Sequence, residues 1–404
     1  MTIIPRRSTG QGATHHAPRT RRLGRTGRVA GFLLAAACAL GVVAASPGAA
    51  GAVPIGGVNM AQNTTKIVKS TVVFPNSQIK SRAFVLADLD TGAVYAVRRG
   101  HTRSLPASTL KTLTALTILR NVPLTKRVTM TKSVPRPECA CVGLQLGKTY
   151  TVEALLHALV MRSGNDAAEL LATSTGSRAR TLALMNTTAR QLRALDTKAV
   201  TPSGLDGRGQ SISAYDLALI NRAAFADPRY RQIMATRTYR FGPYGGAKKT
   251  IVGQNEMYHM GYRGEIGSKN GWTTAARQTF VAAATRGGRT LLVTLLYNDT
   301  GIAQQAKALL DWGFALPAQP GTLGTLVASA LPKPAIPVPA PKPTPTPTPK
   351  PTPTPTAPVR PVSADGAATP VSVQTSLSLG AVGFAGLALF PGRRPRPVGT
   401  RRRT

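Results

Sequence analysis

The chain has 404 residues, with 51 lysines and arginines against 15 acidic residues, giving a formal net charge of +36. Seven basic residues precede residue 53 and ten follow residue 331, so 34 remain between them against 14 acidic residues. Such an excess indicates an anionic partner. We expect no nucleic acid, because the chain carries an export signal and no nucleic-acid motif. The candidate partners are anionic wall polymers and anionic lipid headgroups. The alternative explanation of the charge is a basic composition shared by all proteins of the source.

Residues 1–52 have the pattern of a signal peptide. Basic residues 19–28 precede the apolar residues 29–45, and Ala50-Gly51-Ala52 is an A-x-A cleavage site before residue 53. Arg21-Arg22 resembles a twin-arginine pair, but the Phe-Leu that usually follows is missing, which favours the general secretory route. We therefore expect export, with residues 53–80 as a lead-in to the folded domain.

The middle of the chain predicts one α+β domain over residues 81–318. Residues 82–88 and 93–97 read as a strand hairpin, and residues 108 to about 226 are mainly helical. Strand patterns return and a final helix closes the domain; these segments are 264–271, 278–284, 290–297 and 301–314. Strands at both ends of a helical middle predict a mainly antiparallel sheet flanked by helices.

The pattern of cysteines and histidines predicts no metal site. Cys38 leaves with the signal peptide, which leaves Cys139 and Cys141 either as free thiols or as a small-ring disulfide. No histidine lies near them to complete a four-ligand set. His157 lies in an apolar helical run and is interpreted as a helix residue without a chemical role.

The C-terminal part predicts a stalk and an anchor. Residues 332–370 are rich in Pro, Thr and Lys and form an expected polyproline-II linker. Residues 371–391 are uncharged and increasingly apolar, and the basic tail 392–404 follows, which is a stop-transfer pattern. The alternative is a disordered or processed tail; a sortase signal is disfavoured because no L-P-x-T-G precedes the apolar stretch.

Three short runs indicate acyl-transfer chemistry: Ser108-Thr-Leu-Lys111, Ser163-Gly-Asn165 and Lys269-Asn-Gly271. Residues three apart share a helix face, so the Lys111 amine can reach the Ser108 hydroxyl and act as its base. Pro106 marks a helix start, which puts Ser108 in the first turn, where the helix dipole favours negative charge. The alternative is a helix-capping serine followed by a solvated lysine.

In this order, the runs resemble the low-molecular-weight D-alanyl-D-alanine carboxypeptidases of the serine penicillin-binding proteins, which trim peptidoglycan stem peptides. The resemblance spans about Ser81 to Leu316 and includes residues 144–156, 185–186, 202–206 and 214–218. It implies the serine β-lactamase/penicillin-binding-protein (transpeptidase-like) fold with a helical subdomain, and neither metal nor organic cofactor. One departure is Asn270, where the family's K-T-G motif has threonine.

The resemblance also implies a role for each residue of the three runs. Ser108 would attack the bond between the last two D-alanines, Lys111 would take its proton, and Lys269 would bind the terminal carboxylate. The remaining expected roles are a proton relay at Ser163, a hold on Lys111 at Asn165, an oxyanion hole from the N–H groups of Ser108 and Trp272, and substrate contacts at Asn270, Gly271, Trp272 and Thr273. For Trp272, strand packing is an equal alternative.

Several activities remain compatible with these motifs. Water as the second substrate gives a carboxypeptidase, whereas an amine gives a transpeptidase. A β-lactamase is disfavoured, because residues 199–269 contain no Glu-x-x-x-Asn. A silent surface protein that binds wall peptides or penicillins is the remaining alternative. The expected partners are stem peptides, β-lactams as covalent inhibitors, and the membrane through the C-terminal anchor.

Overall fold

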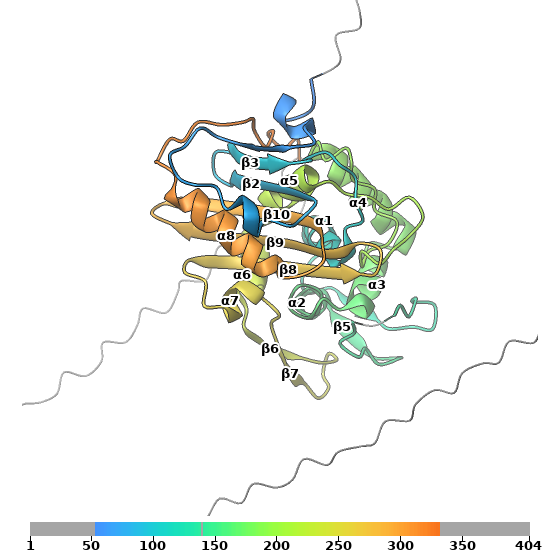
Figure 1. Ribbon diagram of the computed structural model, residues 1–404. Helices are drawn as coiled ribbons and strands as arrows, with labels where there is room; N and C mark the ends of the chain where they lie inside the picture. The colour runs from blue at the N-terminus through green and yellow to red at the C-terminus, as the bar shows by residue number, and fades with distance from the viewer. Residues whose placement is uncertain (1–52, 139, 332–404) are drawn as a thin grey trace, which may run out of the picture. The chain divides into compact units, whose positions relative to one another are not determined.

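A six-stranded antiparallel sheet forms the centre of the computed structural model, which describes residues 53–138 and 140–331 (Figure 1). The strand order is β1-β3-β2-β10-β9-β8. The strands are β1 (Thr65–Ile67), β2 (Ala83–Asp88), β3 (Val94–Arg98), β8 (Glu265–Thr273), β9 (Arg277–Arg286) and β10 (Arg289–Asn298). The opening hairpin and the three late strands are thus confirmed, and β2 pairs with β10 to join them.

Alternating side chains of the strands build two cores, one on each face of the sheet. On β2, Phe84 and Leu86 pack with α8 (Ile302–Ala315), while Val85 and Ala87 join the core of the other helices. A strand sends successive side chains to opposite faces, so the two sets point to opposite sides of the sheet. Both sets are buried because helices pack on both faces. This confirms the expected α+β arrangement of an antiparallel sheet between helices.

The helical region between β3 and β8 forms the larger core. Its helices are α1 (Lys111–Asn121), α2 (Val152–Arg162), α3 (Asn165–Thr173), α4 (Arg178–Gln191), α5 (Ala214–Ala226), α6 (Pro228–Ala235) and α7 (Glu256–His259). Two small sheets interrupt it, β4 (Arg127–Thr129) with β5 (Thr149–Thr151) and β6 (Thr238–Phe241) with β7 (Lys249–Val252). These sheets were not predicted from the sequence, because strands of three or four residues are too short to show a periodic pattern.

The two ends of the described segment meet at the sheet edge opposite β8. The Thr325 amide donates to Gly56 O at 3.0 Å, and the Leu323 amide donates to Val94 O of β3 at 2.9 Å. Tyr215 of α5 donates its hydroxyl to Thr325 O at 2.7 Å. A side chain at Gly56, which has a φ of +84°, would lie 2.5 Å from that hydroxyl. Residues 53–61 and 322–331 therefore pack as part of the domain.

The predicted signal peptide, linker, anchor and basic tail lie outside the described residues. Within residues 53–138 and 140–331, the helices are all too short or too polar to cross a membrane. Cys141 is disulfide-bonded. The chain's other cysteines, Cys38 and Cys139, lie outside the described part.

Candidate active site

Ser108 lies in a tight turn at the start of α1. The turn is a 3-10 helix, Ala107–Leu110, capped by Pro106 and continued by α1, so Ser108 lies in a first helical turn as expected. Ala107 has a φ of +46°, in the left-handed region that non-glycine residues rarely adopt. A Cβ on Gly204 would lie 1.8 Å from Ala107 O, so the chain needs a glycine there to pack against this turn. Thr279 of β9 also donates to Pro106 O at 2.8 Å, which ties the turn to the sheet.

Lys111 is buried, with 1% of its surface exposed, and its amine is surrounded by three oxygens. Lys111 Nζ lies 2.8 Å from Ser108 Oγ, 2.7 Å from Asn165 Oδ1 and 2.6 Å from Ser203 O. The Asn165 and Ser203 oxygens can only accept hydrogen bonds. A neutral amine would donate both N–H groups to them and turn its lone pair to the Ser108 hydroxyl. The geometry therefore suits a general base.

The electrostatics of the site also favour a neutral Lys111. Burial lowers its pKa well below the usual value, and the positive charge of Lys269 lowers it further. Asp166 and Glu169 of α3 act in the opposite direction but do not reverse the shift. Asp166 also accepts hydrogen bonds from the backbone amides of Val142, Gly143 and Leu144, which fixes the loop before β5.

The turn between α2 and α3 supplies the second run. Ser163 ends α2 with a φ of 56°, and Asn165 begins α3. Both side chains are buried, with 7% and 4% exposed. Asn165 Nδ2 donates to Glu138 O at 2.8 Å while its Oδ1 accepts from Lys111, so the orientation of the amide is set from both sides. Ser163 lines the same cavity as Ser108.

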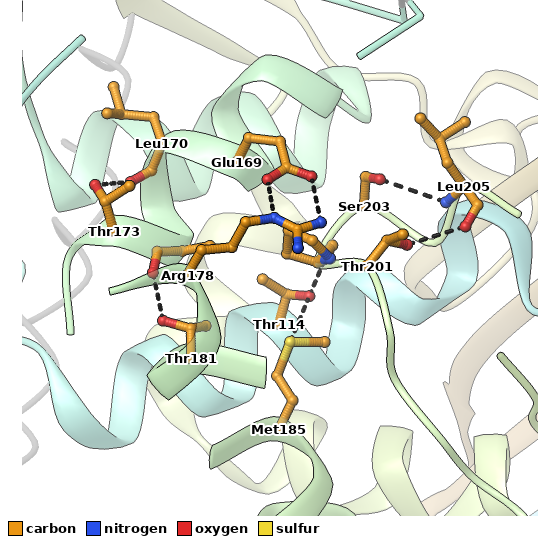
Figure 2. A network of polar contacts seen from close by, with 12 residues as sticks. Thr114, Glu169, Leu170, Thr173, Arg178, Thr181, Met185, Thr201, Ser203 and Leu205 are labelled. Atoms are coloured by element: carbon orange, nitrogen blue, oxygen red, sulfur yellow. Dashed lines mark hydrogen bonds and ion pairs between the residues drawn. The ribbon is translucent and has the colours of Figure 1, made fainter. Parts of the chain in front are cut away.

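A network of hydrogen bonds between α1 and the loop that carries Ser203 holds this loop in place. Thr114 of α1 donates to Pro202 O at 2.7 Å, and Thr201 donates to Leu205 O at 3.0 Å (Figure 2). Ser203 Oγ accepts from the Leu205 amide at 3.4 Å. In the same view, Glu169 of α3 forms an ion pair with Arg178 of α4, with 2.7 Å between the closest atoms. No role was predicted for Ser203, although residues 202–206 are part of the family resemblance.

The third run lies on the edge strand β8. Lys269 is buried, with 4% exposed, and its amine donates to Asn270 O at 2.6 Å and to Asn270 Oδ1 at 3.2 Å. Burial lowers the pKa of Lys269 to about 7, against the opposing effect of Glu256. A Cβ on Gly271 would lie 2.6 Å from the Ser108 amide nitrogen, so glycine allows β8 to approach the nucleophile.

Two cavities of about 610 Å³ each meet at Ser108. The first contains Ser163, Glu256 and Asn270, and the second contains Asn165, Asp206 and Thr273. Trp272 lines both cavities, and 64% of its surface is exposed. The alternative that Trp272 serves only to pack the strand is therefore wrong. Thr273 donates to Asp206 Oδ1 at 3.0 Å. All nine residues predicted for the site therefore lie around Ser108 or on the adjoining strand.

Two further residues belong to this arrangement, and neither was predicted from the sequence. Glu256 accepts a hydrogen bond from Asn270 Nδ2 at 2.6 Å, and no pattern in the sequence marks it. Asp206 closes the second cavity across from β8. His157 stacks on Tyr239 with ring centroids 3.9 Å apart, which fits its predicted structural role.

Residues 68–300 match the family model Peptidase_S11, D-alanyl-D-alanine carboxypeptidase. The chain is 43% identical over 253 residues to D-alanyl-D-alanine carboxypeptidase DacB2 of Mycobacterium tuberculosis, covering 61% of this chain and 86% of that protein. DacD of Salmonella typhimurium is 28% identical over 251 residues, which cover 58% of this chain and 63% of DacD.

Solved structures give the same relationship. A D-alanyl-D-alanine carboxypeptidase from Mycobacterium tuberculosis superposes with a TM-score of 0.61 at 40% identity, covering 64% of this chain and 99% of that one. The Streptomyces K15 DD-transpeptidase gives 0.56 at 29% identity, covering 61% and 100%. The fold is that of the penicillin-binding DD-peptidases. The chain belongs to the D-alanyl-D-alanine carboxypeptidase family and is a serine-type hydrolase, which confirms the resemblance found in the sequence.

Proposed function

We propose that the protein is an exported carboxypeptidase that removes the terminal D-alanine from peptidoglycan stem peptides through an acyl-enzyme on Ser108. The contact that carries the proposal is the 2.8 Å between Lys111 Nζ and Ser108 Oγ. A lysine activates a serine only when its amine is neutral, and the buried position of Lys111 favours that form. Membership of the carboxypeptidase family supports the substrate class.

Acylation begins when Ser108 Oγ attacks the carbonyl carbon of the penultimate D-alanine. Lys111 Nζ accepts the hydroxyl proton, and the carbonyl electrons move onto the oxygen. The backbone N–H groups of Ser108 and Trp272 stabilise that oxyanion. The close approach of Gly271 to the Ser108 amide supports this assignment, because it brings β8 beside the first of the two donors.

The leaving group departs with a proton from the same lysine. As the tetrahedral intermediate collapses, the C–N bond breaks, and Ser163 relays the Lys111 proton to the leaving nitrogen, which releases D-alanine. Asn165 holds the Lys111 amine throughout. Water then attacks the ester, Lys111 accepts a proton from it, and Ser108 regains its hydroxyl when the Oγ–C bond breaks. An amine in place of water would give transpeptidation.

Substrate recognition follows the direction of β8. Lys269 is the cation for the terminal carboxylate, with Asn270 beside it on the wall of the first cavity. Trp272 and Thr273 border the second cavity, which receives the acyl part of the peptide. Gly271 leaves room for the substrate backbone between the two. β-Lactams, whose ring opens on acylation, would occupy the same positions as covalent inhibitors.

The location proposed is the outer face of the cell membrane. The support is the signal-peptide pattern of residues 1–52 and the stop-transfer pattern of residues 371–404, with the proline-rich linker between domain and anchor. Fractionation of expressing cells tests this. Full-length protein in the membrane fraction is expected, and full-length protein in the cell-free medium would contradict the anchor.

Labelling with benzylpenicillin tests the acyl-enzyme. Intact-mass measurement should find one added penicillin on the wild type and none on Ser108→Ala. Ser70→Ala is the matched control. It changes an exposed serine that is not part of the site, and it should label like the wild type. Unchanged labelling of Ser108→Ala, or an unlabelled wild type, would contradict the proposal.

A further inference from the structure

The side chain of Asn270 is engaged on both sides. Its Oδ1 lies 3.2 Å from Lys269 Nζ, and its Nδ2 donates to Glu256 Oε1 at 2.6 Å. Lys269 also donates to the backbone oxygen of Asn270. A cation, an amide and a carboxylate thus form one hydrogen-bonded chain, with Asn270 and Glu256 on the wall of the cavity that also holds Ser108. A threonine at position 270 could not span this gap in the same way, since its single hydroxyl replaces two polar groups at different ends of an amide.

Glu256 is held in position by the start of α7. Asn255 precedes it, and its Oδ1 accepts from the Tyr258 amide at 3.2 Å and from Ser268 Oγ at 2.6 Å. Asn255 Nδ2 donates to Glu265 Oε2 at 2.9 Å. These bonds join α7 to β8 at positions 265 and 268, and the Glu256–Asn270 bond joins them again at 270. Glu256 is therefore half-buried and fixed against the strand that carries Lys269.

The charge of Lys269 depends on what surrounds it. Burial disfavours its ammonium form, and Glu256 is the nearby group that favours it. Lys111 is a second amine in the same site, and the positive charge of Lys269 disfavours protonation of Lys111. The remaining titratable or charged side chains on the elements packed against β8 are Arg229, Tyr230 and Arg231 of α6, Tyr258 and His259 of α7, and Arg277 and Arg286 of β9.

Those other groups do not replace Glu256. Arg229 is paired with Asp227 at 2.7 Å, and Arg286 is paired with Asp311 at 3.0 Å. The Tyr230 hydroxyl lies 3.3 Å from Thr112 Oγ1. Apart from Glu256, the set contains cations, one histidine and two tyrosines. Glu265, on β8 itself, is paired with Arg237, so Glu256 is the carboxylate among these residues and those of β8 that can balance Lys269.

We propose that Glu256 is a positioning residue of the carboxylate-recognition site, which fixes the Asn270 amide and, through it, holds a positive charge on Lys269. This rests on the proposed function, in which Lys269 receives the terminal carboxylate of the peptide. Preference for a free terminal carboxylate should weaken as the pH rises and Lys269 loses its proton, and removal of the Glu256 charge should move that loss to lower pH.

The test compares two donor peptides that end in D-Ala-D-Ala, one with a free carboxylate and one with a carboxamide. Release of D-alanine or D-alaninamide is measured between about pH 5 and about pH 9 for the wild type and Glu256→Gln. In Glu256→Gln, the pH at which the carboxylate preference is lost should fall by about one unit, the size of a single nearby charge effect. At neutral pH, KM for the carboxylate peptide should rise about tenfold, with kcat within about twofold and little change for the carboxamide.

Three further variants separate the effect of the Glu256 charge from a general effect of substitution. Glu256→Asp retains the charge and should restore most of the carboxylate preference. Asn270→Thr breaks the bridge without changing Glu256 and should shift the profile in the same direction as Glu256→Gln. Glu153→Gln removes an exposed acid on α2 and should behave like the wild type.

The outcomes separate this inference from the proposed function. An unchanged pH profile and unchanged carboxylate preference in an active, folded Glu256→Gln enzyme would overturn the role of Glu256 alone. A wild type that releases neither product and is not labelled by penicillin would overturn the proposed function, and the role of Glu256 with it.

Discussion

Lys111 Nζ and Ser108 Oγ lie 2.8 Å apart, and the amine reaches the hydroxyl from a position held by two other elements. Asn165 at the start of α3 and the Ser203 carbonyl after α4 accept its two other hydrogen bonds. Because both of these oxygens can only accept, they align the amine for proton transfer from Ser108. The pairing of base and nucleophile therefore depends on residues far from either in sequence.

Replacement of Lys111 by arginine should strongly slow acylation. Arginine keeps the positive charge but cannot give up its proton near neutral pH, so it cannot serve as the base. The rate of penicillin acylation should fall by about a hundredfold to ten-thousandfold, the range for loss of a general base. Intact-mass measurements on samples quenched at a series of times give this rate. A variant that acylates at the wild-type rate would rule out Lys111 as the base.

Asn165→Asp should move the pH dependence of acylation upward. A carboxylate at the place of Asn165 Oδ1, 2.7 Å from Lys111 Nζ, would favour the ammonium form and raise the pKa of Lys111. The acidic limb of the acylation rate should then shift to higher pH relative to the wild type. Asn121→Asp, an exposed change at the end of α1, serves as the control and should leave the profile in place. A shift to lower pH in Asn165→Asp would have the wrong sign.

Gly271→Ala should impair the reaction more than the fold. The added Cβ would lie 2.6 Å from the Ser108 amide nitrogen and 2.6 Å from Thr279 Oγ1, so the nucleophile or β8 must move. Loss of one aligned oxyanion donor typically costs about a hundredfold to a thousandfold in rate. Gly246→Ala, where the nearest atom is a proline ring carbon at 3.3 Å, is the matched control. Wild-type acylation by Gly271→Ala would contradict the close approach of β8 to Ser108.

The contribution of His101 to stability should depend on pH. His101 Nδ1 lies 2.7 Å from Asp196 Oδ2 and Nε2 lies 2.9 Å from Ile55 O, so both ring nitrogens face acceptors. Burial alone would lower the pKa of His101, but the hydrogen bonds to Asp196 and Ile55 outweigh it and the pKa is raised. A raised folded-state pKa gives stability that is complete below the unfolded value of about 6.5 and is lost as the pH rises through the folded value.

His101→Gln should therefore destabilise the protein at acidic pH by about 1.5 to 3 kcal/mol, the usual contribution of hydrogen bonds to a charged group. The difference in free energy of unfolding between the two proteins should shrink as the pH rises. Denaturant unfolding at several pH values measures it. A difference that stays constant, or grows with pH, would exclude a protonated His101 in the native state.

The parts of the site that the sequence predicted are those with local signals. Ser108 and Lys111 are three residues apart, Pro106 marks the turn before them, and continuous apolar runs identify β9 and β10. The 3-10 turn was not predicted, because it depends on Ala107 adopting a positive φ against Gly204, a contact between distant segments.

Ser203 and Glu256 could not be assigned for the same physical reason. Ser203 contributes a backbone oxygen 92 residues away from Lys111, and a backbone atom leaves no trace in residue type. Glu256 lies on a helix of four residues, too short for a periodic pattern, and reaches Asn270 only after α7 folds against β8. Asn270 was recognised as a departure from the family motif, but its partner became visible only in three dimensions.

The most direct test of the central claim is D-alanine release from a stem pentapeptide by wild-type enzyme and by Ser108→Ala. The wild type should release one D-alanine per peptide, with the tetrapeptide as the other product, and Ser108→Ala should release none above the uncatalysed rate. Release by Ser108→Ala at the wild-type rate, or intact pentapeptide after incubation with a folded wild type that binds penicillin, would contradict carboxypeptidase action through Ser108.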